Sequence, residues 1–227
     1  MPDVLLINPN TRLALTSQLV AQIDAMQLVP GLRLHGATAS FGDDYIASER
    51  SYVVAAHAVV DIWQAHLALY GRPDAVLVAC FGDPGVWALR EMDRVPVMGL
   101  AEAAMREADE LGPFGIVTGG AAWGPMLERL ARGMRLGGHD HLRAVRTVDA
   151  SGGMLSAQPA VGRPLLTRAC QALLEDDRAQ SPDKPLASVI VGGAALAGWA
   201  AQMQADSPDV PLIDSVEAGA RWLQRVL

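Results

Sequence analysis

AVLVACFGDPG, residues 75–85, is the stretch that decides the fold of this chain. Its first five residues are small or branched and apolar, which is typical of a buried strand, and the run stops at Cys80. Asp83 is expected to cap the next helix, or alternatively to act as a base, with Pro84 in the first helical turn. Cys80 is therefore predicted at the carboxyl end of a parallel strand, where open α/β sheets bind ligands. Amide groups and the helix dipole at such a place favour anions and are expected to lower the pKa of a thiol.

The composition fits a globular protein with a substantial core. The 227 residues are 51% hydrophobic and 19% charged, enough to bury a large apolar interior. A net charge of −7 without a basic cluster argues against a nucleic-acid partner. The first residues lack the basic start and apolar run of a signal peptide, and no apolar stretch is expected to span a membrane. Two cysteines make no disulfide framework, so we expect a cytoplasmic location.

The order of the expected elements repeats within the chain. Strands are predicted over 3–7, 32–37, 75–79 and 95–99, and again over 114–118, 142–148, 187–191 and 210–213. Asn8 lies 72 residues before Cys80, and Thr118 lies 75 residues before Gly193. We therefore expect an α/β fold with two pseudosymmetric parallel-sheet half-domains, residues 1–99 plus 209–227 and residues 100–208, and an active site in the cleft between them. One continuous sheet is the alternative.

Two equivalent half-domains around one substrate suit racemisation at a carbon next to a carbonyl or carboxylate. One group removes the proton from one face of that carbon, and a second group returns a proton to the other face. Thiols suit this work because they titrate near neutral pH. Main-chain N–H groups after each strand, around Phe81, Gly82 and Ala194, are expected to hold the carboxylate or the developing enolate oxygen. By the repeat, Gly193 stands where a second thiol is needed.

Further substrate-binding candidates follow the first strand of each half. The amides of Asn8 and Asn10 suit a carboxylate or ring carbonyl, although an Asx turn beside Pro9 also explains them. Thr118 is the repeat-mate of the Asn8 region. Its hydroxyl, with the N–H of Gly119, is expected to bind the same ligand.

A loop and several histidines complete the set of candidates. Tyr45 and Ser48 lie in a glycine-containing loop that leads into a long helix, and such loops often close over a site. His57 and His66 are nine residues apart, which is not a metal-binding spacing on a helix. The segment 139–141, His-Asp-His, lacks a third and fourth ligand. We therefore predict no metal site and no cofactor.

Three stretches resemble the aspartate/glutamate/hydantoin racemase superfamily, in particular its hydantoin and allantoin racemase branch. They are INPNT at 7–11, ACFGDPG at 79–85 and PVMGLAEAA at 96–104. The resemblance implies a cofactor-independent, two-domain α/β enzyme, commonly oligomeric, that uses two cysteines. In that family the second cysteine ends a strand in a Leu-Gly-Cys-Ala-Gly-Met string, where this chain has Gly193. Cys170 lies in a helical apolar pattern and is predicted to pack in the core instead.

The leading hypothesis is a cofactor-independent racemase or epimerase in which Cys80 transfers a proton. Its substrate would be a small carboxylate or hydantoin-like molecule, such as a hydantoin, allantoin or an amino-acid derivative. One alternative is a single-cysteine lyase or isomerase, similar to the arylmalonate decarboxylases and maleate isomerases of the wider superfamily. The other is a non-catalytic small-molecule binder. No nucleic acid or membrane partner is expected, and the resemblance implies a homo-oligomer.

Overall fold

The computed structural model describes residues 1–134, 136, 141–207 and 209–227. The first part of the chain forms β1 (Asp3–Asn8), α1 (Leu13–Ala25), β2 (Arg33–Thr38), α2 (Glu49–Tyr70), β3 (Ala75–Val78), α3 (Val86–Met92) and β4 (Val97–Gly99). There follow α4 (Leu100–Leu111), β5 (Phe114–Gly119), α5 (Trp123–Met134), β6 (Leu142–Val148), α6 (Gly152–Ala157), α7 (Pro159–Gln180) and β7 (Ser188–Gly192). The 3₁₀ turn η1 (Ala194–Leu196), α8 (Trp199–Met203), the 3₁₀ turn η2 (Gln204–Asp206), β8 (Leu212–Asp214) and α9 (Ser215–Val226) complete the series.

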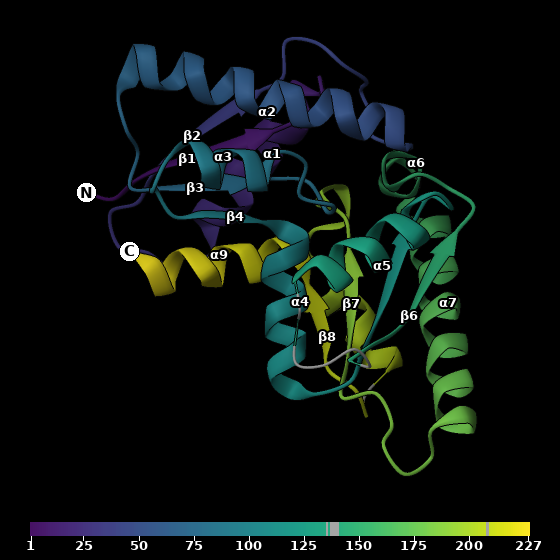
Figure 1. The fold of residues 1–227 in the computed structure, drawn as a ribbon. Helices are drawn as coiled ribbons and strands as arrows, with labels where there is room; N and C mark the ends of the chain where they lie inside the picture. Colours follow the sequence, from purple (N-terminus) through teal and green to yellow (C-terminus); the bar gives the residue numbers. More distant parts are fainter. Residues whose placement is uncertain (135, 137–140, 208) are drawn as a thin grey trace. The chain divides into compact units, whose positions relative to one another are not determined.

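These elements form two compact units, residues 1–100 with 219–227 and residues 101–218. Each unit has a four-stranded sheet, in the order β2-β1-β3-β4 in the first and β6-β5-β7-β8 in the second (Figure 1). All the strand pairs in both sheets are parallel. The predicted α/β fold with two similar half-domains is confirmed.

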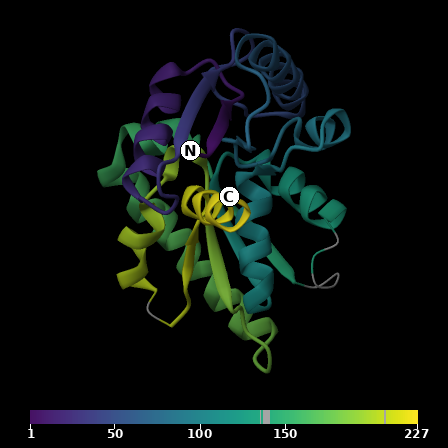
Figure 2. The same ribbon diagram turned by 90° about the vertical axis from the view of Figure 1, so that its left-hand side faces the viewer.

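The first sheet has helices on both faces. Leu5, Ile7, Val76, Val78 and Val97 point to one face, where they form a core with α2 and α3 residues, among them Val59, Trp63 and Leu89. Gly36 of β2 meets Thr16 and Val20 of α1 on the other face. α1 and α2 thus cover opposite faces of β1 and β2, as Figure 2 shows. This double cover explains why β1 is apolar without interruption from Val4 to Ile7.

The second sheet is covered in the same way. Val117, Val189 and Val191 pack with apolar residues of α6, α7 and α8 on one face. Gly124 of α5 faces Thr147 of β6 on the opposite face. The apolar pattern of the sequence predicts one helix here, over 164–176, and does not predict α6 and α8. The observed α7 begins before this range and ends after it.

One expectation needs correction. Residues 209–218 belong to the second unit, because β8 pairs with β7, and only residues 219–227 return to the first.

The helix α2 is long and apolar enough to cross a membrane, by length and composition alone. Core helices of globular proteins pass the same test, and one face of α2 packs on the sheet of the first unit.

Candidate active site

Cys80 lies just beyond the carboxyl end of β3, as predicted. The preceding residue, Ala79, donates its N–H to the carbonyl of Ile7 at 2.8 Å, so the end of β3 is fixed beside the end of β1. The Cys80 N–H donates to the Val78 carbonyl at 3.0 Å. Cys80 is a free cysteine and is buried, with 9% of the residue exposed.

The prediction that amide groups and the helix dipole lower the pKa of Cys80 is wrong. Burial raises the pKa of the Cys80 thiol above its ordinary value, and the negative charge of Asp83 raises it further. The helix expected to stabilise a thiolate begins only at Val86, and its N-cap is Gly85. Desolvation is the larger of these two causes, and both favour the protonated thiol.

The loop after Cys80 uses most of its own amide groups. The N–H groups of Gly82 and Asp83 both donate to the Cys80 carbonyl, at 3.0 and 3.2 Å. The N–H of Phe81 has no hydrogen-bond partner among the residues that the structure describes. Of the predicted main-chain donors in this loop, Phe81 is thus the one whose N–H remains for a ligand, while that of Gly82 is occupied.

Asp83 does not cap α3. Its φ of +58° lies in the left-handed region, and the N-cap position is taken by Gly85. The side chain is 2% exposed. It lies against Gly99, since a Cβ built on Gly99 would come within 2.1 Å of the Asp83 Cγ. Asp83 is therefore a buried carboxyl packed on the end of β4.

Asn8 and Asn10 differ in what they leave for a ligand. Asn8 is fully buried; its Nδ2 donates to the Arg12 carbonyl at 3.1 Å and to Thr16 Oγ1 at 3.0 Å, and its Oδ1 accepts from the Asn10 N–H at 3.3 Å. Asn10 Oδ1 accepts from the Arg12 N–H at 3.0 Å. The Nδ2 of Asn10 has no partner within the described part of the chain. Asn8 therefore holds the loop in Asx-turn fashion, and Asn10 offers the free donor.

The candidates on β5 are also engaged locally. The Thr118 hydroxyl donates to the Gly192 carbonyl at 2.8 Å, so only its acceptor capacity is left for a ligand. A Cβ on Gly119 would lie 2.5 Å from the Ala150 carbonyl oxygen, which shows that Gly119 is required for close packing. Thr118 thus links β5 to β7, and Gly119 lets β5 pack against the segment at Ala150.

Gly193 follows β7 directly, and Ala194 opens the turn η1. The φ of Gly193 is +142°, a conformation that other residues rarely adopt. Its N–H donates to Ser215 Oγ at 3.2 Å. Sequence reasoning missed Ser215 and the neighbouring Asp214. The signal that could have found them is the likeness of 210–220, VPLIDSVEAGA, to 95–105, VPVMGLAEAAM, since both have a Val-Pro strand followed by a Glu and small residues.

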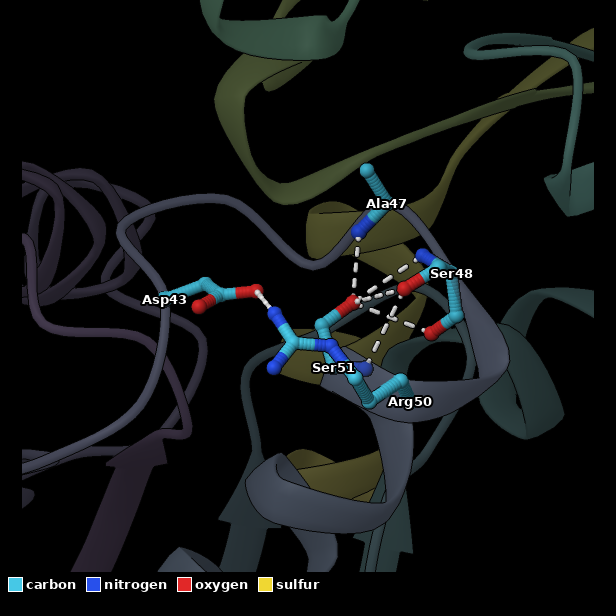
Figure 3. Close-up of polar contacts among 5 residues, drawn as sticks. All are labelled: Asp43, Ala47, Ser48, Arg50 and Ser51. Atoms are coloured by element: carbon cyan, nitrogen blue, oxygen red, sulfur yellow. Dashed lines mark hydrogen bonds and ion pairs between the residues drawn. The ribbon is translucent and has the colours of Figure 1, made fainter.

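The loop residues Tyr45 and Ser48 precede α2. Ser48 caps this helix: its Oγ accepts from the Ser51 N–H at 3.2 Å, and Ser51 Oγ accepts in return from the Ser48 N–H at 3.0 Å (Figure 3). This reciprocal pair is a capping box. Ser48 therefore caps α2, a structural role that was not expected from the sequence. Tyr45 is half-buried in the loop before α2.

The remaining cysteine and histidines are placed as structural residues. Cys170 is fully buried in the core beside α8, as predicted. His66 packs between His35 and Tyr70, with ring centroids 6.1 and 5.2 Å away. Among the described residues no three His, Cys, Asp or Glu side chains are grouped to hold a metal ion. His139 and Asp140 lie outside the described residues.

Comparison with known proteins agrees with this arrangement. A family model described as Asp/Glu/Hydantoin racemase matches residues 4–223. The hydantoin racemase of Paenarthrobacter aurescens is 29% identical over 96% of this chain and 88% of its own length. The allantoin racemase of Pseudomonas fluorescens has a similar structure, with a TM-score of 0.84 and 26% identity over 99% of this chain and 90% of that one.

The allantoin racemase of Klebsiella pneumoniae is equally similar, with a TM-score of 0.84 and 26% identity over 100% of this chain and 87% of that one. The match of the family model covers nearly the whole chain, both half-domains included. It also agrees with the resemblance carried by the residues around Asn8, Cys80 and Gly99. The chain belongs to the Asp/Glu/hydantoin racemase family, and the predicted isomerase class is confirmed at this level.

Proposed function

We propose that this protein racemises a hydantoin-like ring or a related amino-acid derivative without a cofactor, and that Cys80 transfers the proton on one face of the reacting carbon. The observation that carries the proposal is a free thiol just beyond the carboxyl end of β3 in a chain of the racemase family. The named substrates of similar proteins, hydantoins and allantoin, supply the substrate class.

The reaction needs only proton transfers. The C–H bond next to the ring carbonyl breaks, and its electron pair moves onto the carbonyl oxygen as an enolate. A proton then returns to the opposite face and restores the C–H bond with inverted configuration. With Cys80 as a thiol, water on the opposite face accepts the C–H proton, Cys80 gives its proton to the enolate, and solvent re-protonates the thiolate. In the reverse direction the Cys80 thiolate accepts the C–H proton and water supplies the returning one. The free Phe81 N–H and Asn10 Nδ2 are the donors we assign to the substrate oxygens.

The proton on the other face must come from a group other than a second cysteine, because Gly193 occupies the corresponding place. Water is the candidate we favour. The roles of Asn8, Gly82, Thr118, Gly119, Gly193 and Ala194 as substrate-binding residues stay predictions. So do the site in a cleft between half-domains, the homo-oligomer and the cytoplasmic location.

A second candidate is a single-cysteine lyase that decarboxylates a malonate-type substrate. The presence of one protonated thiol favours it, since such a reaction requires a proton donor on only one face of the enolate. Loss of carbon dioxide would take the place of the first proton transfer, and Cys80 would protonate the enolate.

The test is incubation of each enantiomer of allantoin and of 5-substituted hydantoins in D2O, followed by NMR and polarimetry. Exchange of the ring hydrogen with loss of optical rotation is expected for the wild-type protein. Cys80→Ser should lower the rate by about a thousandfold or more, since it removes the proton-transfer group. Cys170→Ser is the matched control and should keep the rate. Full turnover in Cys80→Ser would overturn the proposal, and carbon dioxide release from malonates would favour the lyase.

A further inference from the structure

The two half-domains can be aligned residue by residue from their backbone. Gly85 precedes α3 with a φ of +78°, and Gly198 precedes α8 with a φ of +82°. Cys80 and Gly193 each lie five residues before these glycines. The turns between them also match, because Asp83 donates its N–H to the Cys80 carbonyl at 3.2 Å and Leu196 donates to the Gly193 carbonyl at 2.9 Å.

The strand register extends this alignment to the last strand of each sheet. Val78, two residues before Cys80, pairs with Gly99 of β4. Val191, two residues before Gly193, pairs with Asp214 of β8. Gly99 and Asp214 therefore occupy equivalent positions, at the carboxyl ends of equivalent strands.

Each unit has one buried carboxyl at this position, but it comes from opposite elements. In the first unit the strand residue is Gly99, and the Asp83 carboxyl from the loop fills the place where a side chain on Gly99 would lie, with its Cγ and Oδ1 both 2.1 Å from the position of such a Cβ. In the second unit the strand residue itself is Asp214, which is 2% exposed. The residue that corresponds to Asp83 is the apolar Leu196.

The Asp214 carboxyl at the end of β8 binds both the loop after Gly193 and the start of α9. Asp214 Oδ2 accepts from the Gly198 N–H at 2.7 Å, which fixes the loop after Gly193. Its Oδ1 accepts from the N–H groups of Val216 and Glu217 at 2.9 and 3.2 Å, at the start of α9. A buried carboxyl with such partners is costly to remove, because its partners are left unsatisfied.

We propose that Asp83 is a positioning residue for Cys80: its carboxyl fixes the loop that carries Cys80 to the end of β4, as Asp214 fixes the loop of Gly193 from the opposite element. The inference rests on the proposed function in one respect: it takes from it that Cys80 transfers a proton. The left-handed backbone of Asp83 supports it, because only Gly, Asn and Asp adopt that conformation readily. The charge of Asp83 also acts on the thiol directly and favours its protonated form.

The first test measures the rate at which iodoacetamide alkylates Cys80 as a function of pH, with the modified cysteine identified by mass spectrometry. Asp83→Asn keeps the shape and tolerates the left-handed backbone, so the variant should fold. Its alkylation midpoint should move to lower pH, so that alkylation on the rising part of the profile is faster than in the wild type. Asp61→Asn, an exposed change on α2, should leave the midpoint unchanged. A midpoint in Asp83→Asn equal to that of the wild type would overturn the charge effect.

The second test moves the carboxyl from the loop to the strand. Gly99→Asp alone should be strongly destabilised, because its side chain would collide with Asp83. Asp83→Gly alone keeps the backbone conformation but loses the anchor, so we expect kcat to fall about tenfold or more with KM unchanged. The double variant Asp83→Gly/Gly99→Asp moves the carboxyl from the loop to the strand residue, as in the second unit, with Gly at the loop position where that unit has Leu196. It should recover both the thermal stability and the alkylation profile of the wild type.

A double variant no better than Asp83→Gly in stability and in alkylation profile would refute the positioning role. These two readouts need no substrate, so they remain decisive if no racemase activity is found. In that case the proposed function fails and the placement of Cys80 by Asp83 is still tested.

Discussion

Replacing Gly193 by cysteine would supply the second thiol that the internal repeat calls for, and the structure predicts what this costs. The φ of Gly193 is +142°, where an L residue is strained. A Cβ at this position would lie 3.2 Å from Leu196 Cδ1 and 3.3 Å from its Cγ, closer than ordinary van der Waals contact. Backbone strain of this kind costs about 1–3 kcal/mol.

We therefore expect Gly193→Cys to lower the free energy of unfolding by about 2 kcal/mol. For a chain of this length that corresponds to a decrease in Tm of about 4–8 °C. Gly193→Ala is the matched control, because it adds the same Cβ without the thiol and should lose about as much stability. Leu196→Ala combined with Gly193→Cys removes the close contact, so it separates crowding from backbone strain.

The measurements are thermal unfolding followed by circular dichroism, and racemisation followed by polarimetry and by exchange in D2O. Any gain in racemisation should appear in Gly193→Cys and be absent from Gly193→Ala. If Gly193→Cys melts within about 1 °C of the wild type, the strain argument is wrong. If the variant is stable and shows no gain in racemisation, the alignment of Gly193 with Cys80 fails as a guide to the second proton donor.

Three further predictions concern positions away from Cys80. Cys170→Ala should lower the free energy of unfolding by about 1 kcal/mol, comparable to the loss of one buried methyl group. It should leave turnover unchanged, because Cys170 is fully buried in the core. A large loss of turnover would contradict this. Ser48→Ala removes a capping side chain from α2 and should cost about 1 kcal/mol in chemical denaturation, whereas an unchanged midpoint would show that Ser51 caps the helix alone. Burial, and next the charge of His35, lower the pKa of His66.

The folded state thus binds the proton on His66 less readily than the unfolded state does. Stability is fully present above the unfolded pKa, near 6.5, and falls as the pH drops through that value toward the lower folded pKa. His66→Leu should flatten this part of the profile of stability against pH, measured by urea denaturation between pH 5 and pH 8. A profile with the same slope in the variant would assign the effect to another group.

The inner strands were predictable because most of their residues are apolar and buried, as expected for parallel sheets covered on both faces. The ranges expected for β1 and β6 agree closely with the observed ones, Asp3–Asn8 and Leu142–Val148. The short helices α6 and α8 were missed, because five or six residues do not display a helical period and both segments contain or follow glycine. Their placement depends on tertiary packing.

The position of Cys80 was predictable from the chain, and its protonation state was not. A run of apolar residues that ends at a cysteine places the thiol at a strand end. The raised pKa depends on how deeply the thiol is buried and on the Asp83 carboxyl, which a left-handed turn holds nearby. The sequence also did not reveal Asp214 as a site residue, because its equivalence to Gly99 follows from the strand register, which only the structure provides.

The two units differ in which segments of the chain form them, and this difference affects the order of folding. Residues 101–218 form one uninterrupted segment, whereas the first unit also needs residues 219–227. Gly219 packs closely on Leu77 and Leu100, so this late segment belongs to the interior of the first unit. During synthesis from the amino end, the second unit can therefore acquire all its residues while the first still lacks part of its core. The strand β3, which leads to Cys80, would therefore complete its packing around Leu77 only after the unit made later has been synthesised.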